Sequence, residues 1–279
     1  MRGRFLSSSA KSFVELWNPA AHNVLSSRDD WYASAAKDDN FISKGGKVYP
    51  YDIIHANSDP LCRLMAESGF ENEVALGSKI VDVGCANGDL SYALSLAGFD
   101  VTALDWSFAH DQAPAFVSAV AKQNNLDMSV VDISVDRYFG IDDIRSSAVH
   151  RQERIPDIYE LAISFGLVYH LKNPFAFFES ISKIAKRFLV GTHVVTHLPQ
   201  LGARIDGSPV AYLVDTLELN SDPTNYWMMT PKAFERIALR CGFQIEARIA
   251  IPNNPLGVST PDDPSLGVRH FLALRSTAV

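Results

Sequence analysis

The stretch KIVDVGCANGDLSYALSLAGFDVTALD, from Lys79 to Asp105, constrains the fold of this chain more than any other. It opens with a short apolar, β-branched run, Ile80 to Val83, which is typical of a buried strand. A glycine-containing loop follows, and Leu90 to Ala97 then carries apolar residues at helical spacing, closed by Gly98. A second apolar run, Phe99 to Leu104, stops at the acid that ends the stretch. The order strand, glycine loop, helix, strand, acid predicts two strands of a parallel sheet joined through a helix.

The loop and the acid together predict a binding site for a nucleoside. Small residues at Gly84, Ala86 and Gly88 let the backbone come close to a ligand. The helix N-terminus behind them offers unpaired N–H groups and partial positive charge, which suit an anion such as a carboxylate. Asp105, at the tip of the second strand, can accept both hydroxyls of a ribose. We therefore expect a nucleoside-bearing ligand across the carboxyl ends of the sheet.

Two ligand classes compete for this loop. Dinucleotide-binding loops carry G-x-G-x-x-G, and GCANGDL lacks the third glycine of that pattern. The loop instead resembles motif I of the class I S-adenosylmethionine-dependent methyltransferases, VLDVGCGxG, with an acid at the end of the second strand. It departs from that motif only at Ala86, which is still small. The alternative is a glycine turn that binds no ligand.

Size and composition limit the function classes. A chain of 279 residues with 47% hydrophobic residues suits one large domain, or a domain with an elaborated end. The net charge of −7 argues against a broad nucleic-acid surface, which would be basic. The widely spaced Cys62, Cys85 and Cys241 form neither a disulfide framework nor a C-x-x-C metal site, and they fit a reducing cytoplasm. The start of the chain lacks the apolar region of a signal peptide, and no apolar run reaches the roughly 18 residues of a membrane span.

Residues 1–70 precede the predicted sheet and are rich in aromatic residues. The pattern is irregular, with Gly45, Gly46 and Pro50 as breakers, until a helix predicted from Pro60 to Phe70. The resemblance implies an N-terminal helical cap that covers the cofactor and lines the substrate pocket, on a methyltransferase domain formed by residues 71–279. The alternative is that these aromatic residues only pack the cap onto the core.

The resemblance also implies cofactor contacts from residues after the second and third strands. A bulky apolar residue, here Trp106, is placed against the adenosine. Asp132 would accept from the adenine amino group while Ile133 touches the ring; capping of a turn is the other possibility for Asp132. The full set of expected cofactor-binding residues is Asp82, Gly84, Cys85, Ala86, Gly88, Asp105, Trp106, Asp132, Ile133 and Phe165.

The fourth predicted strand runs from Asp157 to Phe165, and the segment after it lies beside the cofactor in a doubly wound sheet. It contains neither the Asn- or Asp-Pro-Pro-Tyr motif of amide and amine methylation nor the Pro-Cys nucleophile of pyrimidine methylation. GLVYHLKNP resembles the G-V-L-Y-H-x-x-x-P segment of the tRNA wobble-uridine carboxymethyl transferases. That resemblance places Tyr169 at the transferable end of the cofactor. His170 is the candidate general base, because its usual pKa is near neutrality; the alternative is a structural histidine that holds the loop.

The rest of the chain completes the predicted fold. His193 and His197 follow the fifth strand, but no carboxylate or cysteine stands at ligand spacing beside them, so we expect no metal. Residues 198–230 are predicted to be an insertion without regular structure that acts as a substrate lid. Thr230 caps a helix whose pattern resembles the same methyltransferase group, and strands follow at Phe243 to Ile249 and Val268 to Leu274. The resulting fold class is α/β, a doubly wound, mostly parallel seven-stranded sheet whose last strand is antiparallel.

We therefore predict a cytoplasmic S-adenosylmethionine-dependent methyltransferase that acts on an oxygen or nitrogen of a small molecule, with Tyr169 and His170 as catalytic residues. A tRNA wobble-uridine carboxymethyl transferase is the first alternative. It would need a cation for the extra carboxylate and a basic RNA-facing surface, and the pI near 5.6 counts against it. The second alternative is a nucleoside-binding protein without catalytic activity on the same fold. The sequence leaves the acceptor and the oligomeric state open.

Overall fold

The computed structural model describes residues 11–37, 48, 53–109, 112–198, 202–219, 221–253, 258–260 and 267–279. The main strands of its central sheet are β1 (Lys79–Val83), β2 (Asp100–Asp105), β3 (Met128–Asp132), β4 (Ala148–His150), β5 (Leu161–Phe165), β6 (Arg187–Val194), β11 (Phe243–Pro252) and β12 (Val268–Ser276). Their order across the sheet is β11-β12-β6-β5-β1-β2-β3-β4. β1 pairs in parallel with both β2 and β5, whereas β12 is antiparallel to β6 and β11. The strands that follow β1 in sequence are therefore added first on one side of it (β2, β3) and then on the other (β5, β6), as expected for a doubly wound sheet, and the predicted fold class is confirmed.

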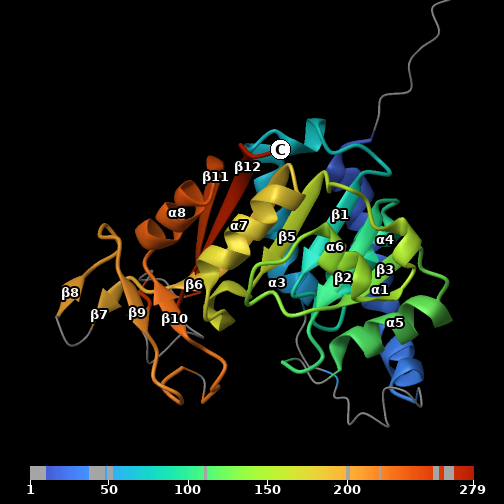
Figure 1. Ribbon diagram of the computed structural model, residues 1–279, viewed down its shortest axis with the longest axis horizontal. Coiled ribbons are helices and arrows are strands. Elements are labelled where there is room, and N and C mark those ends of the chain that lie inside the picture. Colours follow the sequence, from blue (N-terminus) through green and yellow to red (C-terminus); the bar gives the residue numbers. More distant parts are fainter. Residues whose placement is uncertain are drawn as a thin grey trace, which may run out of the picture.

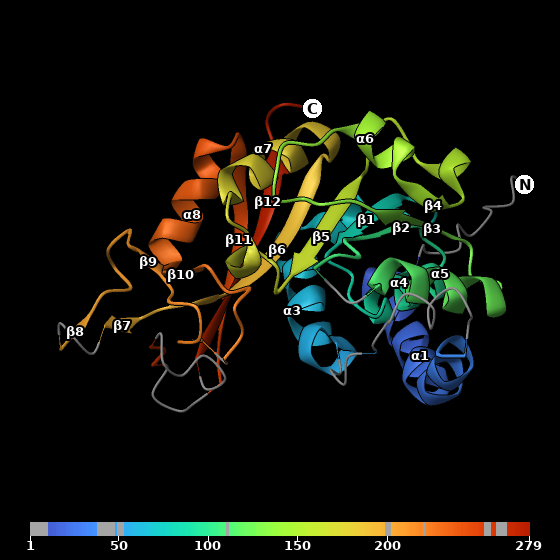
Figure 2. The same cartoon turned by 60° about the horizontal axis from the view of Figure 1, so that its bottom comes forward.

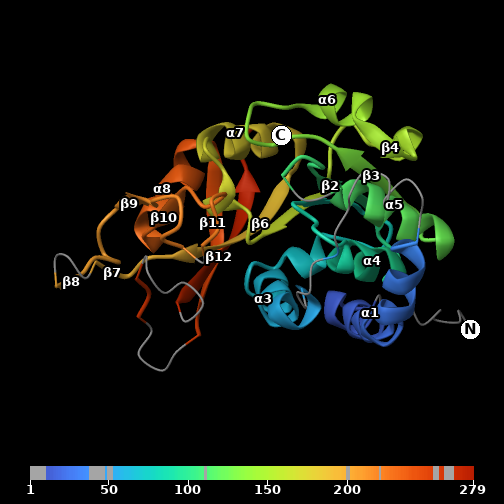
Figure 3. The same cartoon turned by 90° about the horizontal axis from the view of Figure 1, so that it is seen from below.

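Helices cover both faces of this sheet (Figures 1, 2 and 3). One face carries α1 (Phe13–Ala35), α3 (Ile53–Glu67), α4 (Asp89–Leu96) and α5 (Ala113–Gln123). The other carries α6 (Ile141–Ser146), α7 (Pro174–Ile184) and α8 (Pro231–Arg240). Short 3₁₀ turns lie at η1 (Phe70–Asn72), η2 (Gln152–Arg154) and η3 (Val168–His170).

Alternation along the strands divides the core into two layers. In β1, Ile80 belongs to the hydrophobic cluster beneath α1, α3, α4 and α5. Val81 and Val83 belong to the cluster beneath α7 and α8. Successive strand side chains point to opposite faces, so a strand covered on both faces is apolar at nearly every position. This is why β1, β3 and β5 are mostly apolar instead of alternating between apolar and polar residues.

The N-terminal segment is more regular than its sequence suggested. α1 begins at a capping box, in which the Ser12 side chain accepts from Glu15 N and the Glu15 carboxylate accepts from Ser12 N at 2.7 Å. Trp17 and Val24 are both fully buried and face the core about two helical turns apart. α3 begins at Ile53 and includes Pro60, where the predicted helix began. The breakers Gly45, Gly46 and Pro50 lie outside the described residues.

The expectation that residues 198–230 lack regular structure was wrong. They contain β8 (Ala203–Arg204), β9 (Ala211–Leu213) and β10 (Trp227–Met229), and β8 pairs with β7 (His197–Leu198). β10 joins the central sheet through the pair Met229 and Val194 of β6, and β9 pairs with β10. β4, β9 and β10 thus raise the central sheet from the seven predicted strands to ten among the described residues, whereas β7 and β8 form a separate pair.

No helix in the described part of the chain combines the length and the apolar character that crossing a bilayer requires.

Candidate active site

The glycine loop between β1 and α4 is a tight left-handed turn. Gly84, Ala86 and Gly88 have φ values of 78°, 49° and 87°. Gly88 N donates to Cys85 O at 2.8 Å, and Gly84 N donates to Leu104 O at 2.8 Å, which fixes the loop against the end of β2. A Cβ atom at Gly88 would lie 2.6 Å from the Tyr92 ring, so this position requires glycine for space as well as for φ. Ala86 adopts its left-handed conformation at a cost of about 1 kcal/mol.

The structure brings Asp105 and the glycine loop together. One carboxylate oxygen, Oδ2, accepts from Ala86 N at 2.7 Å, and the other, Oδ1, accepts from Trp106 N at 2.7 Å. The residue is only 6% exposed. The Asp105 carboxylate therefore holds the glycine loop against the end of β2.

Two further predicted residues lie beneath the loop rather than on its surface. Asp82 is buried, and its carboxylate accepts from Ser91 Oγ at 2.6 Å. Burial raises the pKa of Asp82 to about 7, against the opposing effect of the Ser91 hydrogen bond, and the nearby Asp105 charge raises it further. Burial also raises the pKa of the Cys85 thiol, so that side chain remains protonated and packs the turn.

The residues predicted to hold adenine lie at the ends of β2 and β3. Ile133 N donates to Asp105 O at 2.9 Å, and the Ile133 side chain is buried. Asp132 Oδ1 accepts from Ser107 N at 2.9 Å, which supports the turn-capping alternative for this acid. Trp106 remains 37% exposed, with its ring 5.2 Å from that of Phe108.

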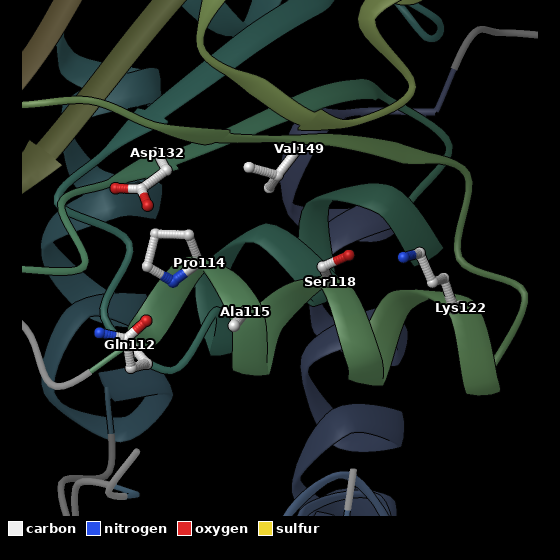
Figure 4. Close-up of a pocket in the computed structure, with 7 residues that line it drawn as sticks. All are labelled: Gln112, Pro114, Ala115, Ser118, Lys122, Asp132 and Val149. Atoms are coloured by element: carbon white, nitrogen blue, oxygen red, sulfur yellow. The ribbon is translucent and has the colours of Figure 1, made fainter. Parts of the chain in front are cut away.

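Asp132 also lines a small cavity of about 120 Å³ (Figure 4). The cavity lies along α5 and is lined by Gln112, Pro114, Ala115, Ser118, Lys122, Asp132 and Val149. No residue of the glycine loop belongs to that lining. The cavity therefore shares Asp132 with the predicted site and is otherwise separate from the glycine loop.

At the end of β5, an aromatic pair that the sequence did not reveal supports Phe165. The Phe165 and Phe271 rings meet edge to face with centroids 5.4 Å apart. A Cβ atom at Gly191 would lie 2.2 Å from Phe271, and 3.2 Å from Phe165, so this glycine of β6 makes room for the pair. Gly166 N donates to Gly191 O at 2.9 Å, which continues the parallel pairing of β5 and β6 to the start of the segment that holds the predicted catalytic residues.

The two predicted catalytic residues lie in η3, between the sheet and the insertion. The rings of Tyr169 and His170 have centroids 4.2 Å apart. Tyr169 O accepts from Tyr226 N at 2.8 Å, and His170 Nδ1 lies 2.9 Å from Thr224 Oγ1 and 3.3 Å from Thr224 O. The insertion therefore holds the backbone of one residue and the ring of the other.

The hydrogen bonds of Thr224 indicate which nitrogen of His170 carries the proton. The Thr224 hydroxyl donates its proton to Asp222 Oδ1 at 2.7 Å, and the Thr224 carbonyl can only accept. Nδ1 of His170 is therefore the donor in both contacts, which leaves Nε2 as the proton-accepting nitrogen of the neutral ring. This tautomer is the one that a general base acting through Nε2 needs.

His193 and His197, the other two histidines near the end of β6, make different contacts. The His193 ring meets Tyr169 at 70° with centroids 5.4 Å apart. Burial, followed by the charge of Arg269, lowers the pKa of His193 to about 4, so its ring is neutral at pH 7. His197 Nδ1 instead lies 3.0 Å from Thr196 Oγ1. Within the described ranges, no three His, Cys, Asp or Glu side chains are grouped as ligands for a metal ion.

Comparisons with known proteins identify the family and the fold. The model of a family described as "Methyltransferase domain" matches residues 57–248. Among solved structures, magnesium protoporphyrin IX methyltransferase (ChlM) from Synechocystis PCC 6803 with bound SAH is similar to this chain, with a TM-score of 0.51 and 14% identity. The alignment covers 94% of this chain and 100% of that one.

A second solved structure, the N-terminal domain of EvdMO1 with SAH bound, is similar with a TM-score of 0.50 and 12% identity. That alignment covers 76% of this chain and 79% of that one. No curated protein matches the sequence. At these identities the structural neighbours establish the fold, whereas the family model spans more than half of the chain. The chain belongs to the methyltransferase-domain family.

Proposed function

We propose that this protein transfers a methyl group from S-adenosylmethionine to an oxygen or nitrogen of a small-molecule acceptor. The observation that carries the proposal is the contact between Asp105 Oδ2 and Ala86 N, because it joins an acid suited to a ribose with a loop suited to an anion. Both named structural neighbours have SAH, the demethylated form of this cofactor, bound. The family match favours transfer over simple nucleoside binding.

The described residues fit this cofactor. Asp105, at the tip of β2, would accept from the ribose hydroxyls, and the backbone of Gly84 to Gly88 would lie against the amino-acid portion. Trp106, partly exposed after β2, offers apolar surface where the resemblance places the adenine, and the buried Ile133 packs at the end of β3. When bound, S-adenosylmethionine would supply an electrophilic methyl group on a sulfonium. The aromatic face of Tyr169 suits such a positive centre.

The residues after β5 would act on the acceptor. His170, oriented through Nδ1 by Thr224, would accept a proton at Nε2 from an acceptor hydroxyl or amine. Asp222 accepts the Thr224 hydroxyl proton and so fixes the orientation of that pair. Most of the rate enhancement would come from alignment of the two reactants, an effect worth up to about 7–11 kcal/mol in favourable cases.

The division of the chain follows from the same proposal. Residues 71–279 would form the catalytic domain and residues 1–70 the cap. α1 docks on the start of α4, where the Tyr32 hydroxyl donates to Asp89 and Arg28 Nε lies 3.5 Å from the same carboxylate. Residues 198–230 would form the substrate lid, tied to the catalytic segment through Tyr226 and Thr224. The acidic pI disfavours a nucleic-acid acceptor, and no comparison bears on the likeness to tRNA wobble-uridine enzymes.

Titration calorimetry with S-adenosylhomocysteine tests the cofactor assignment. Asp105→Ala should weaken binding by at least about 100-fold, because two hydrogen bonds to a charged acceptor are lost and each contributes about 1.5–3 kcal/mol. Asp142→Ala is the matched control, since the Asp142 side chain is fully exposed on α6. Unchanged affinity in the Asp105 variant would remove the ribose assignment.

A further inference from the structure

Arg269 lies at the start of β12, at the edge of the sheet where β6 ends. It pairs with His193 in the antiparallel register of β12 and β6, so both side chains lie on the same face of the sheet. Its Nη1 donates to Asn57 Oδ1 at 3.3 Å and its Nη2 to Ala56 O at 3.0 Å, both on α3. The guanidinium carbon lies 5.2 Å from the centre of the Phe271 ring.

The positive charge of Arg269 has no acidic partner within the described structure. Burial lowers its pKa, and the only opposing effect comes from Tyr169. Its Nε is buried and meets no acceptor. Arg275, on the same strand, instead donates to Glu73 and Glu246, and these bonds raise its pKa. A partly buried cation without a counter-charge is destabilising by itself, and arginine is well suited to a planar carboxylate.

Two chains of contacts connect Arg269 with the proposed transfer centre. Phe271, beneath the guanidinium, meets Phe165 at the end of β5 with centroids 5.4 Å apart. His193, opposite Arg269, meets Tyr169 in η3 with centroids also 5.4 Å apart. The buried Nδ1 of His193 has no hydrogen-bond partner among the described residues. A cation and an unsatisfied ring nitrogen thus lie on one face, near Phe165, which is expected to bind the cofactor, and Tyr169, which is expected at its transferable end.

We propose that Arg269, with His193 and Tyr169 beside it, forms a subsite for a carboxylate of the acceptor. The inference rests on the proposed methyl transfer and specifies its substrate class, namely a small carboxylic acid whose methylated atom lies near Tyr169. Arg269 would offer its remaining N–H groups to the carboxylate while Asn57 and Ala56 hold the guanidinium against α3. Phe271 would place the apolar part of the acceptor against an aromatic surface.

Binding of benzoate and of its neutral analogue benzamide, measured by calorimetry on the protein with and without saturating S-adenosylhomocysteine, tests this subsite. In both states the wild type should bind benzoate at least tenfold more tightly than benzamide. Arg269→Gln should abolish that preference, Arg269→Lys should retain part of it, and neither should change S-adenosylhomocysteine affinity more than about twofold, since that ligand lies elsewhere. Arg248→Gln, on the neighbouring strand, removes an exposed arginine as the control and should keep the preference.

Three results would overturn the proposal. Equal binding of benzoate and benzamide by the wild type, or an undiminished preference in the folded Arg269→Gln variant, would mean that no carboxylate subsite exists there. If the Arg269→Gln variant lost S-adenosylhomocysteine affinity, and if S-adenosylhomocysteine competed with benzoate for the wild type, Arg269 would instead hold the carboxylate of the cofactor. Failure of the wild type to bind S-adenosylhomocysteine would refute the proposed function separately, because the benzoate preference is also measured without it.

Discussion

At the scale of single residues, Asp82 carries a buried carboxyl group whose charged form is disfavoured by burial. It lies beneath the glycine loop with one hydrogen bond from Ser91, and burial raises its pKa from 3.8 to about 7. A carboxyl group whose pKa is higher in the folded than in the unfolded state binds more protons when folded. Its contribution therefore favours the folded protein at low pH and is lost as the pH rises from about 4 through 7.

Asp82→Asn should remove this pH dependence. We expect the variant to gain stability relative to wild type as the pH rises from 4 to 7, by up to about 4 kcal/mol, since each pKa unit corresponds to about 1.4 kcal/mol. Urea unfolding of both proteins at several pH values measures the difference in the free energy of unfolding. Asp142→Asn, at a fully exposed position, should show no such trend. A constant difference between wild type and Asp82→Asn would contradict the assigned shift.

Sequence alone predicted the residues whose role depends on local order. Gly84, Gly88 and Asp105 follow one another within a single strand-helix-strand unit, so their meeting requires only that β1 and β2 be adjacent and parallel. Gly191 and Arg269 could not be predicted in the same way. Their roles depend on Phe271 and His193, and those neighbours follow only from the register of β12 on β6.

At the scale of elements, Thr230 connects the insertion, residues 198–230, to α8. It is the N-cap of α8, where its hydroxyl oxygen accepts from Ala233 N at 3.2 Å, as its sequence position predicts. The same hydroxyl donates to Ser208 O at 2.5 Å and accepts from Val210 N at 3.1 Å, both in the insertion. One fully buried side chain therefore satisfies groups of two segments.

Thr230→Ala should destabilise the protein by about 2–4 kcal/mol, because it removes the cap and leaves buried backbone groups unsatisfied. Thr230→Ser keeps the hydroxyl and should lose less than about 1 kcal/mol. Urea unfolding of the three proteins measures both values. If the alanine and serine variants were equally stable, the hydroxyl would not be what connects α8 with the insertion.

The elements that sequence analysis missed are those whose own pattern is short or broken. β4 and β10 contain three residues each, too few to show alternation, and each exists because a neighbouring strand offers an open edge. α1 contains Pro19, yet the Ser12 cap and the buried faces of Trp17 and Val24 maintain the helix. Tertiary contacts thus decide these elements, whereas β1, α4 and β2 are specified locally.

At the scale of the whole molecule, the carboxylate of Glu73 connects the turn η1, which follows the N-terminal helices, with strands β6 and β12. Glu73 follows η1 and lies between Arg187 of β6 and Arg275 of β12, which are opposite each other in the antiparallel register. Glu73 accepts from Arg275 Nη2 at 2.8 Å and from Arg187. Without this acid, two like charges would face each other on adjacent strands, which is destabilising.

Glu73→Gln should therefore lower the free energy of unfolding at pH 7 by about 1–2 kcal/mol. The hydrogen bonds from Arg275 and Arg187 hold the pKa of Glu73 down at about 2, from 4.5. That shift would correspond to about 3 kcal/mol, and we discount it because the side chain is 36% exposed and partly screened by solvent. A carboxyl group with a lowered folded-state pKa stabilises the protein above its unfolded pKa and loses that contribution as the pH falls.

The difference between wild type and Glu73→Gln should thus be constant above pH 5 and shrink as the pH falls from 4.5 towards 2. Urea unfolding across this range measures it, and 1 M salt at pH 7 should reduce it through screening. Glu67→Gln is the matched control, since its ion pair with Arg63 is exposed on α3 and should contribute less than about 0.5 kcal/mol. A Glu73 variant as stable as this control would mean that the paired arginines are tolerated without their shared acid. The connection between η1 and strands β6 and β12 would then depend on apolar packing alone.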